Sequence, residues 1–169
     1  AKEDNVYVQD LTLSKSYGYG IYGGGVSHGG ASFHLDNVSV ESSGRNGIFV
    51  YRTQRSTMKN CNVSHSYKSG LFVRDGLMTI SGNATTIHHN NAIVIYNGRD
   101  GDGNCGLYTH ESSDSIHLVS PLTKESISTN NEGGHNYGGG GTIKSVDKDG
   151  KVLEVVYDGE EDEDEEDDY

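Results

Sequence analysis

The sequence predicts an all-β solenoid built from short, stacked coils. The first observation behind this prediction is an internal repeat of about 23 residues. The second is the periodicity within each repeat, where apolar residues alternate with polar ones in short segments bounded by Gly, Asn and Ser. The third is that no segment has the apolar spacing of an amphipathic helix. A repeat of this length, with two or three short strands and no helix, is typical of a coil of a parallel β-helix.

The repeat is clearest in the first half of the chain. Its first copy spans residues 10–22, and the next copies begin at Asn37, Asn60 and Asn83. In each copy, one apolar residue opens the last strand, and we expect about six coils stacked roughly 4.8 Å apart. These opening residues recur at spacings of 27, 23, 22, 23 and 27 residues, and they are Ile21, Ile48, Leu71, Ile93, Ile116 and Ile143.

We expect the solenoid to form a β-helix domain over residues 1–157, followed by a tail. Val146 and Val152 flank the turn-forming sequence Asp-Lys-Asp-Gly-Lys, which predicts a hairpin that caps the C-terminal end. No comparable cap precedes the first strand, so we expect the chain to be a fragment of a longer protein. Residues 158–169 hold ten acidic side chains, which predicts a solvated and disordered acidic tail.

The net charge of −12 is concentrated in this tail. Of the 25 acidic side chains, ten lie in the tail, which leaves 15 in residues 1–157 against 13 basic ones. Because this nearly neutral body has no basic stripe to displace counterions from phosphates, we expect no nucleic-acid partner. No run approaches 18 apolar residues, so we expect no membrane span.

The cysteines and the glycosylation sequons point to different compartments. Cys61 and Cys105 cannot define a disulfide framework, which favours a reducing compartment. Cys61 stands where other repeats have Leu or Val, so we expect it to be a small buried hydrophobe. Sequons at Asn37, Asn62 and Asn83 favour secretion, although a strand repeat rich in Asn, Val and Ser produces such triplets by itself. The compartment is left open between intracellular, virion-associated and secreted.

The repeat resembles that of a known family. Asn-Val-Ser-Val at residues 37–40, Ser43, and Gly-Ile-Phe-Val at residues 47–50 are similar to one coil of the right-handed parallel β-helix repeat. Pectate lyases, polygalacturonases, alginate epimerases, viral tailspikes and some F-box proteins share this repeat. The resemblance covers residues 6–146 and implies a right-handed coil. These families include enzymes, adhesins and adaptors, so the resemblance implies no single function.

Strand alternation predicts which side chains of the recurring strand face solvent. If Ile21, Ile48 and Leu71 point into the core, the side chains one and three residues after each of them point outward. Aromatic faces stack on sugar rings and arginine hydrogen-bonds to carboxylates, while an apolar ladder also suits a protein interface or a covered structural face. The ligand-binding face predicted in this way consists of Tyr22, Phe49, Tyr51, Phe72, Arg74, Tyr96 and His117.

This face is compatible with two classes of function. The first is a non-catalytic structural or binding module that presents the aromatic strip to a partner protein or a glycan, in an adaptor, an adhesive protein or a virion. Its open ends would also permit an oligomer. The alternative, implied by the resemblance, is a polysaccharide-active domain of the uronate lyase or epimerase type, which needs a base and a cation beside the substrate carboxylate. The candidates for those catalytic roles are Tyr51, Arg74, Tyr96 and His117.

Two observations favour the non-catalytic class. The body shows no carboxylate cluster on a strand, as glycoside hydrolysis would require, since Asp36 and Asp75 are placed at turns. It also shows none of the signature motifs of the resembling enzymes. We therefore carry over no catalytic residue from those families.

One loop has the oxygen spacing of a calcium site. Asp100, Asp102, Asn104 and Glu111 stand at positions 1, 3, 5 and 12 of a calcium-loop-like segment. Position 6, where such a loop requires Gly, is Cys105, and Asp-Gly repeats are also ordinary turn chemistry. We retain calcium as a candidate ligand and expect no other cofactor.

Two sets of polar residues are interpreted as structural. The histidines are dispersed over different predicted coil positions, so we expect them to lie in turns or on the surface. A second set recurs at one coil position, where we expect a hydrogen-bonding ladder that satisfies the turn backbone. This second set is Ser16, Ser43, Ser66 and Asn90.

Overall fold

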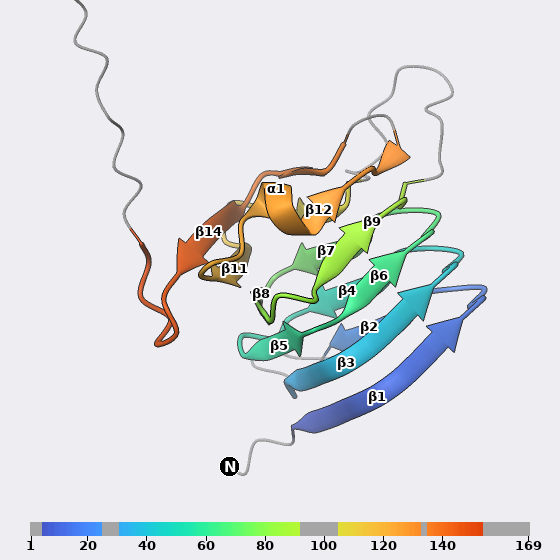
Figure 1. Ribbon diagram of the computed structural model, residues 1–169, viewed down its shortest axis with the longest axis horizontal. Helices are drawn as coiled ribbons and strands as arrows, with labels where there is room; N and C mark the ends of the chain where they lie inside the picture. The colour runs from blue at the N-terminus through green and yellow to red at the C-terminus, as the bar shows by residue number, and fades with distance from the viewer. Residues whose placement is uncertain (1–4, 25–30, 92–104, 133–134, 154–169) are drawn as a thin grey trace, which may run out of the picture.

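The computed structural model describes residues 5–24, 31–91, 105–132 and 135–153. These residues form two sheets of parallel strands that enclose a common apolar core, so the predicted parallel β-helix is confirmed. Figure 1 shows the coils stacked side by side, with the strands of the larger sheet in front of those of the smaller sheet.

The larger sheet has nine strands within the described residues, in the order β12-β9-β6-β3-β5-β8-β11-β14, with β1 also paired to β3. They are β1 (Val6–Ser14), β3 (Phe33–Glu41), β5 (Ser56–Lys59), β6 (Asn62–Ser64), β8 (Leu77–Ser81), β9 (Thr86–His88), β11 (Ser115–Val119), β12 (Ser128–Thr129) and β14 (Thr142–Val146).

Each coil of the larger sheet bends at one position. The long strands β1 and β3 continue through this bend at Asp10 and Asn37, whose φ angles are 52° and 54°. In later coils the bend separates two short strands, at Asn60 between β5 and β6 and at Gly82 between β8 and β9. Asn, Asp and Gly are the residues that tolerate this left-handed backbone best, which explains why these four coils have one of them at the bend.

The smaller sheet has the order β13-β10-β7-β4-β2. One smaller-sheet strand follows the larger-sheet strand or strands of each coil, and every strand pair is parallel. A single-turn helix, α1 (Lys124–Ile127), lies beside β12 and is the only α-helix of the described residues. The strands of this sheet are β2 (Ile21–Gly24), β4 (Ile48–Tyr51), β7 (Leu71–Arg74), β10 (Leu107–Thr109) and β13 (Tyr137–Gly139).

The predicted number of six coils is too high, because the solenoid makes about four turns from β2 to β13. Ile116 and Ile143, which were assigned to the same strand position as Ile21, pair with each other in β11 and β14 of the larger sheet. Leu107 takes the next smaller-sheet position after Leu71. Strands of both sheets open with similar apolar residues, so the regular spacing of these residues did not distinguish the two sheets.

The core lies between the two sheets and consists of the inward-facing residues of both. Cys61 belongs to it at 1% exposure, which confirms the prediction of a small buried hydrophobe. Burial raises the pKa of the Cys61 thiol, and it raises that of Cys105 to about 11. The largest fully buried side chains are Leu35, Ile48, Met58, Leu71, Met78, Ile80, Ile87, Leu107, Ile116, Leu118, Ile127 and Val38.

The predicted polar ladder is present only in part. Asn90 is fully buried and accepts a hydrogen bond from the Ser66 backbone N–H at 3.0 Å. Its amide nitrogen donates to the carbonyl oxygens of Val63 at 3.1 Å and His88 at 3.0 Å. The hydroxyl oxygens of Ser43 and Ser66, in contrast, are buried without a hydrogen-bond partner among the described residues. The serine hydroxyls of these two coils therefore fill space, and the amide of Asn90 supplies the hydrogen bonds.

The predicted C-terminal hairpin is confirmed as far as Leu153. Val146 forms an antiparallel bridge with Val152, and the Leu153 N–H donates to the Ser145 carbonyl at 3.0 Å. The predicted acidic tail, residues 158–169, lies outside the described residues. Among the residues that the structure describes, no helix has the length and apolar character needed to cross a membrane.

Candidate functional site: an aromatic column on the smaller sheet

The register of the smaller sheet places four aromatic side chains in one outward-facing column. Because Ile48 and Leu71 point into the core, Phe49 and Phe72 face outward, and the two rings are cross-strand partners. The column continues to Tyr22 in β2 and to Tyr108 in β10. Tyr108 was missed in the sequence analysis, although Gly-Leu-Tyr at residues 106–108 has the same Gly-apolar-aromatic pattern as the earlier copies.

The rings of this column touch one another over its whole length. Centroid distances are 5.3 Å from Tyr22 to Phe49, 5.1 Å from Phe49 to Phe72 and 5.0 Å from Phe72 to Tyr108. Tyr19, in the turn before β2, stacks on Phe49 at 5.2 Å. These separations are those of favourable aromatic pairs. We call Tyr19, Tyr22, Phe49, Phe72 and Tyr108 the aromatic column.

Exposure is uneven along the column. The side chain of Tyr22 is 53% exposed, whereas Phe72 is only 9% exposed because its neighbours cover it. Tyr22 therefore offers the most accessible ring, and Phe72 forms the floor on which the adjacent rings rest.

Positive charge lies beside the column at the ends of β4 and β7. Tyr51 and Arg74 are cross-strand partners, and the Arg74 guanidinium lies 5.9 Å from the centre of the Tyr51 ring. The Arg52 guanidinium also lies over this ring, 4.7 Å from its centre, and forms an ion pair with Asp75 at 3.5 Å. The structure thus brings the predicted residues Tyr51 and Arg74 together with Phe49 and Phe72.

A small pocket of about 150 Å³ lies between the column and Arg74. Its lining combines aromatic rings with the nitrogen-bearing side chains of Lys68, Arg74 and His110. The His110 Nδ1 atom lies 3.3 Å from the Glu111 carboxylate. The pocket combines an apolar surface with nitrogen donors that can bind carboxylate or hydroxyl oxygens. Its lining residues are Tyr19, Asn46, Phe49, Lys68, Phe72, Arg74 and His110.

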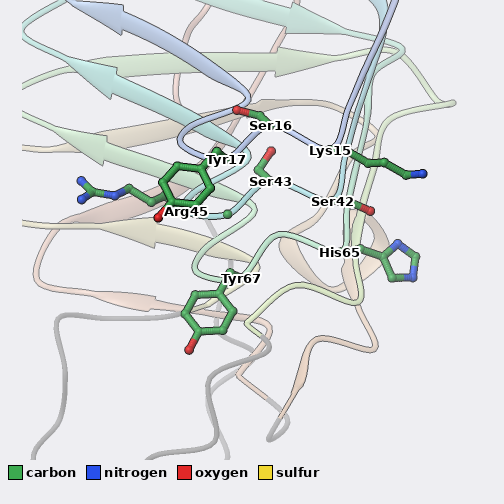
Figure 2. Close-up of a pocket in the computed structure, with 9 residues that line it drawn as sticks. Lys15, Ser16, Tyr17, Ser42, Ser43, Arg45, His65 and Tyr67 are labelled. Carbon is green, nitrogen blue, oxygen red and sulfur yellow. The ribbon is translucent and has the colours of Figure 1, made fainter.

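A second hollow of about 630 Å³ lies at the turns between the two sheets. Figure 2 shows Tyr17, Arg45 and Tyr67 on one side of it and Lys15 and His65 on the other. This groove is larger than the pocket at the column but wide open, and the Tyr17 side chain is fully exposed. We place the candidate site at the aromatic column, because strand pairing holds its rings in fixed positions.

The placement of His117 on the predicted face is wrong. His117 lies in β11 of the larger sheet, between Thr79 of β8 and Lys144 of β14. Strands of both sheets open with an apolar residue and alternate apolar with polar side chains, so the sequence pattern does not show that Ile116 and His117 belong to the larger sheet. Tyr96 lies outside the described residues.

The position of His117 leads to a pH prediction. Burial, and then the charge of Lys144, lowers the pKa of His117 from its ordinary value of 6.5. The folded protein therefore binds fewer protons here than the unfolded chain, so the free energy of unfolding falls as the pH drops through about 6.5. We expect His117→Gln to reduce the difference in urea midpoint between pH 7.5 and pH 5.5. Equal differences in the variant and the parent would contradict this, and the exposed His135→Gln serves as control.

The calcium candidate lies mostly outside the described residues, which exclude Asp100, Asp102 and Asn104. Glu111 is exposed, and its backbone N–H donates to the Asp114 carboxylate at 2.6 Å. Across the part of the chain that the structure describes, no group of three or more His, Cys, Asp or Glu side chains is arranged to hold a metal ion.

Comparison with protein families agrees with this architecture. The fold and its outward-facing column define a repeat protein of the solenoid class, in which successive coils present one continuous surface. The family model described as "Right handed beta helix region" matches residues 1–148, so the chain belongs to this family. Searches of curated proteins and of solved structures give no match.

Proposed function

We propose that the protein is a non-catalytic binding module whose aromatic column binds an acidic glycan. The observation that carries this proposal is the unbroken contact of four outward-facing rings, from Tyr22 to Tyr108, on four successive coils. Sugar rings have apolar faces that stack on aromatic side chains, and a chain of sugars laid across the strands would follow the column, with Tyr22 as its most accessible ring. A partner protein is the other occupant that such an apolar surface suits.

The charge around the column favours an acidic glycan over a neutral one. Lys68, Arg74 and His110 line the same pocket as Phe49 and Phe72. An arginine beside an aromatic floor can hydrogen-bond a carboxylate while the sugar ring stacks next to it. The glycan class expected from this arrangement is a polymer with carboxylate groups.

The prediction is that Tyr22→Ala weakens binding to polygalacturonate or alginate by about two- to twelvefold, if a sugar stacked on the ring is worth about the 0.5–1.5 kcal/mol of an aromatic pair. Arg74→Gln should also weaken binding to these polymers and have less effect on a neutral polymer such as dextran. Binding would be measured by a glycan array followed by titration, with circular dichroism to verify folding. The matched control is Tyr7→Ala, an aromatic residue on β1 of the larger sheet that is 73% exposed.

Two outcomes would contradict the proposal. One is the absence of glycan binding by the parent protein, which would leave a partner protein as the occupant of the column. The other is binding that Tyr7→Ala weakens as much as Tyr22→Ala does.

A polysaccharide lyase or epimerase is a second candidate, favoured by the shared location of Arg74 and His110. A cation beside the substrate carboxylate and a base for the neighbouring proton are the groups such a reaction needs. The same incubations would test it, because a lyase produces an unsaturated sugar that absorbs ultraviolet light. If the parent protein produces this absorbance and Arg74→Gln does not, the site is catalytic, and a lyase replaces the binding module as the proposed function.

A further inference from the structure

Three histidines meet at the corner that follows the larger sheet. Ser64 of β6 pairs with His88 of β9, so the residues after them, His65 and His89, occupy equivalent positions on adjacent coils. Both have left-handed backbones, with φ angles of 55° and 53°. Their rings stack at a centroid distance of 5.4 Å and an angle of 8°. Spacing along the sequence predicts dispersed histidines, but the coil repeat brings these three together.

Two of these rings direct nitrogen atoms at each other. The Nδ1 atoms of His88 and His89 lie 2.7 Å apart. The His88 Nε2 atom lies 3.0 Å from Asn62 Oδ1, which also accepts a hydrogen bond from the Thr86 hydroxyl at 2.9 Å. Because Oδ1 is an acceptor, His88 Nε2 must carry the proton, and the neutral ring then directs the Nδ1 lone pair toward His89.

This arrangement is the one that prepares a histidine to bind a metal. Metal-binding histidines donate their second N–H to an oxygen acceptor, which fixes the tautomer and the orientation of the ring. Asn62 plays that part for His88, and the stacked ring of His65 restricts the rotation of His89.

We propose that His88 and His89 bind a divalent transition metal through their two Nδ1 atoms. Imidazole nitrogen suits Cu²⁺, Ni²⁺ and Zn²⁺, and affinity at such sites is greatest for Cu²⁺. In the metal-free protein, His89 Nδ1–H donates to the lone pair of His88 Nδ1. When the metal binds both Nδ1 atoms, the His89 proton moves through solvent to the exposed Nε2 atom of the same ring, so both imidazoles stay neutral. Water completes the coordination, since no third His, Cys, Asp or Glu of the described residues joins the pair in a metal-binding group.

The test is isothermal titration of the tag-free full chain with CuCl₂, ZnCl₂ and CaCl₂ at pH 7.5. We expect one Cu²⁺ per chain, bound more tightly than Zn²⁺, and an electron paramagnetic resonance spectrum with two imidazole nitrogens. His89→Gln should remove this binding, and the exposed position of His89 keeps the variant folded. Asn62→Ala should weaken it about 10- to 100-fold by releasing the His88 ring. We expect Ca²⁺ to give no heat that depends on His88 or His89.

The matched control is His34→Gln, since His34 lies on β3 with its Nδ1 bonded to Thr57 at 2.9 Å. This variant should bind Cu²⁺ as the parent does. The proposal is overturned if His88→Gln and His89→Gln both keep stoichiometric Cu²⁺ binding. It is also overturned if the parent protein binds Cu²⁺ no more tightly than free imidazole does.

Discussion

Replacing Gly47 with valine is expected to destabilise the solenoid by about 3 kcal/mol or more, because the coils leave no room for a side chain here. A Cβ atom at Gly47 would lie 2.8 Å from the carbonyl oxygen of Gly70 and 2.7 Å from the Ser66 hydroxyl, and it would also meet the Val63 side chain. The Gly70 carbonyl accepts the hydrogen bond of Ile48 N–H at 2.8 Å, so it cannot move away without breaking a link between coils.

The measurement is the urea midpoint of unfolding, monitored by circular dichroism. The control is a substitution at another glycine, Gly18. Gly18→Ala places a methyl group where nothing lies within 4 Å, so its midpoint should stay close to that of the parent. A Gly47→Val protein with the parent's midpoint would show that the coils can separate locally at little cost. The same close approach recurs on other coils, at Gly20, Gly70 and Gly106.

Asn90→Ala is the second substitution with a large expected effect. It would leave the Ser66 N–H and the carbonyl oxygens of Val63 and His88 buried without their present partner. An unsatisfied buried polar group costs about 1–3 kcal/mol, so we expect a loss of at least about 3 kcal/mol in the free energy of unfolding. The measurement is again the urea midpoint.

Ser66→Ala is the matched control for Asn90→Ala, because it changes a residue at the same coil position. The Ser66 hydroxyl is buried without a hydrogen-bond partner among the described residues, so its removal should be nearly neutral or stabilising. If both variants lost stability equally, volume at this position would matter more than hydrogen bonding.

The fold was predictable because the repeat specifies it at several levels. Asn or Asp recurs at the left-handed bend within the larger sheet, Gly recurs where coils approach closely, and β-branched residues fill the strands. In the first three coils this was enough to place Tyr22, Phe49 and Phe72 on one face. The sequence identifies a coil position well when that position imposes one structural requirement, such as a left-handed backbone or a close approach between coils.

The rest of the site could not be predicted from spacing alone. Coils differ in the length of their turns, so the interval from Leu71 to Leu107 is longer than that from Ile48 to Leu71. A fixed period therefore placed His117 on the wrong sheet. The Gly-apolar-aromatic pattern, which is local and independent of turn length, would have identified Tyr108.

The pairing of each strand only with strands of adjacent coils has a consequence for cooperativity. A solenoid of this kind behaves as a one-dimensional chain, in which each unit is stabilised by its nearest neighbours. A defect in one coil can then allow the coils on either side of it to open separately. A molecule bound along the aromatic column would contact four coils at once. It would therefore couple the unfolding of β2, which holds Tyr22, to that of β10, which holds Tyr108, although these strands share no hydrogen bond.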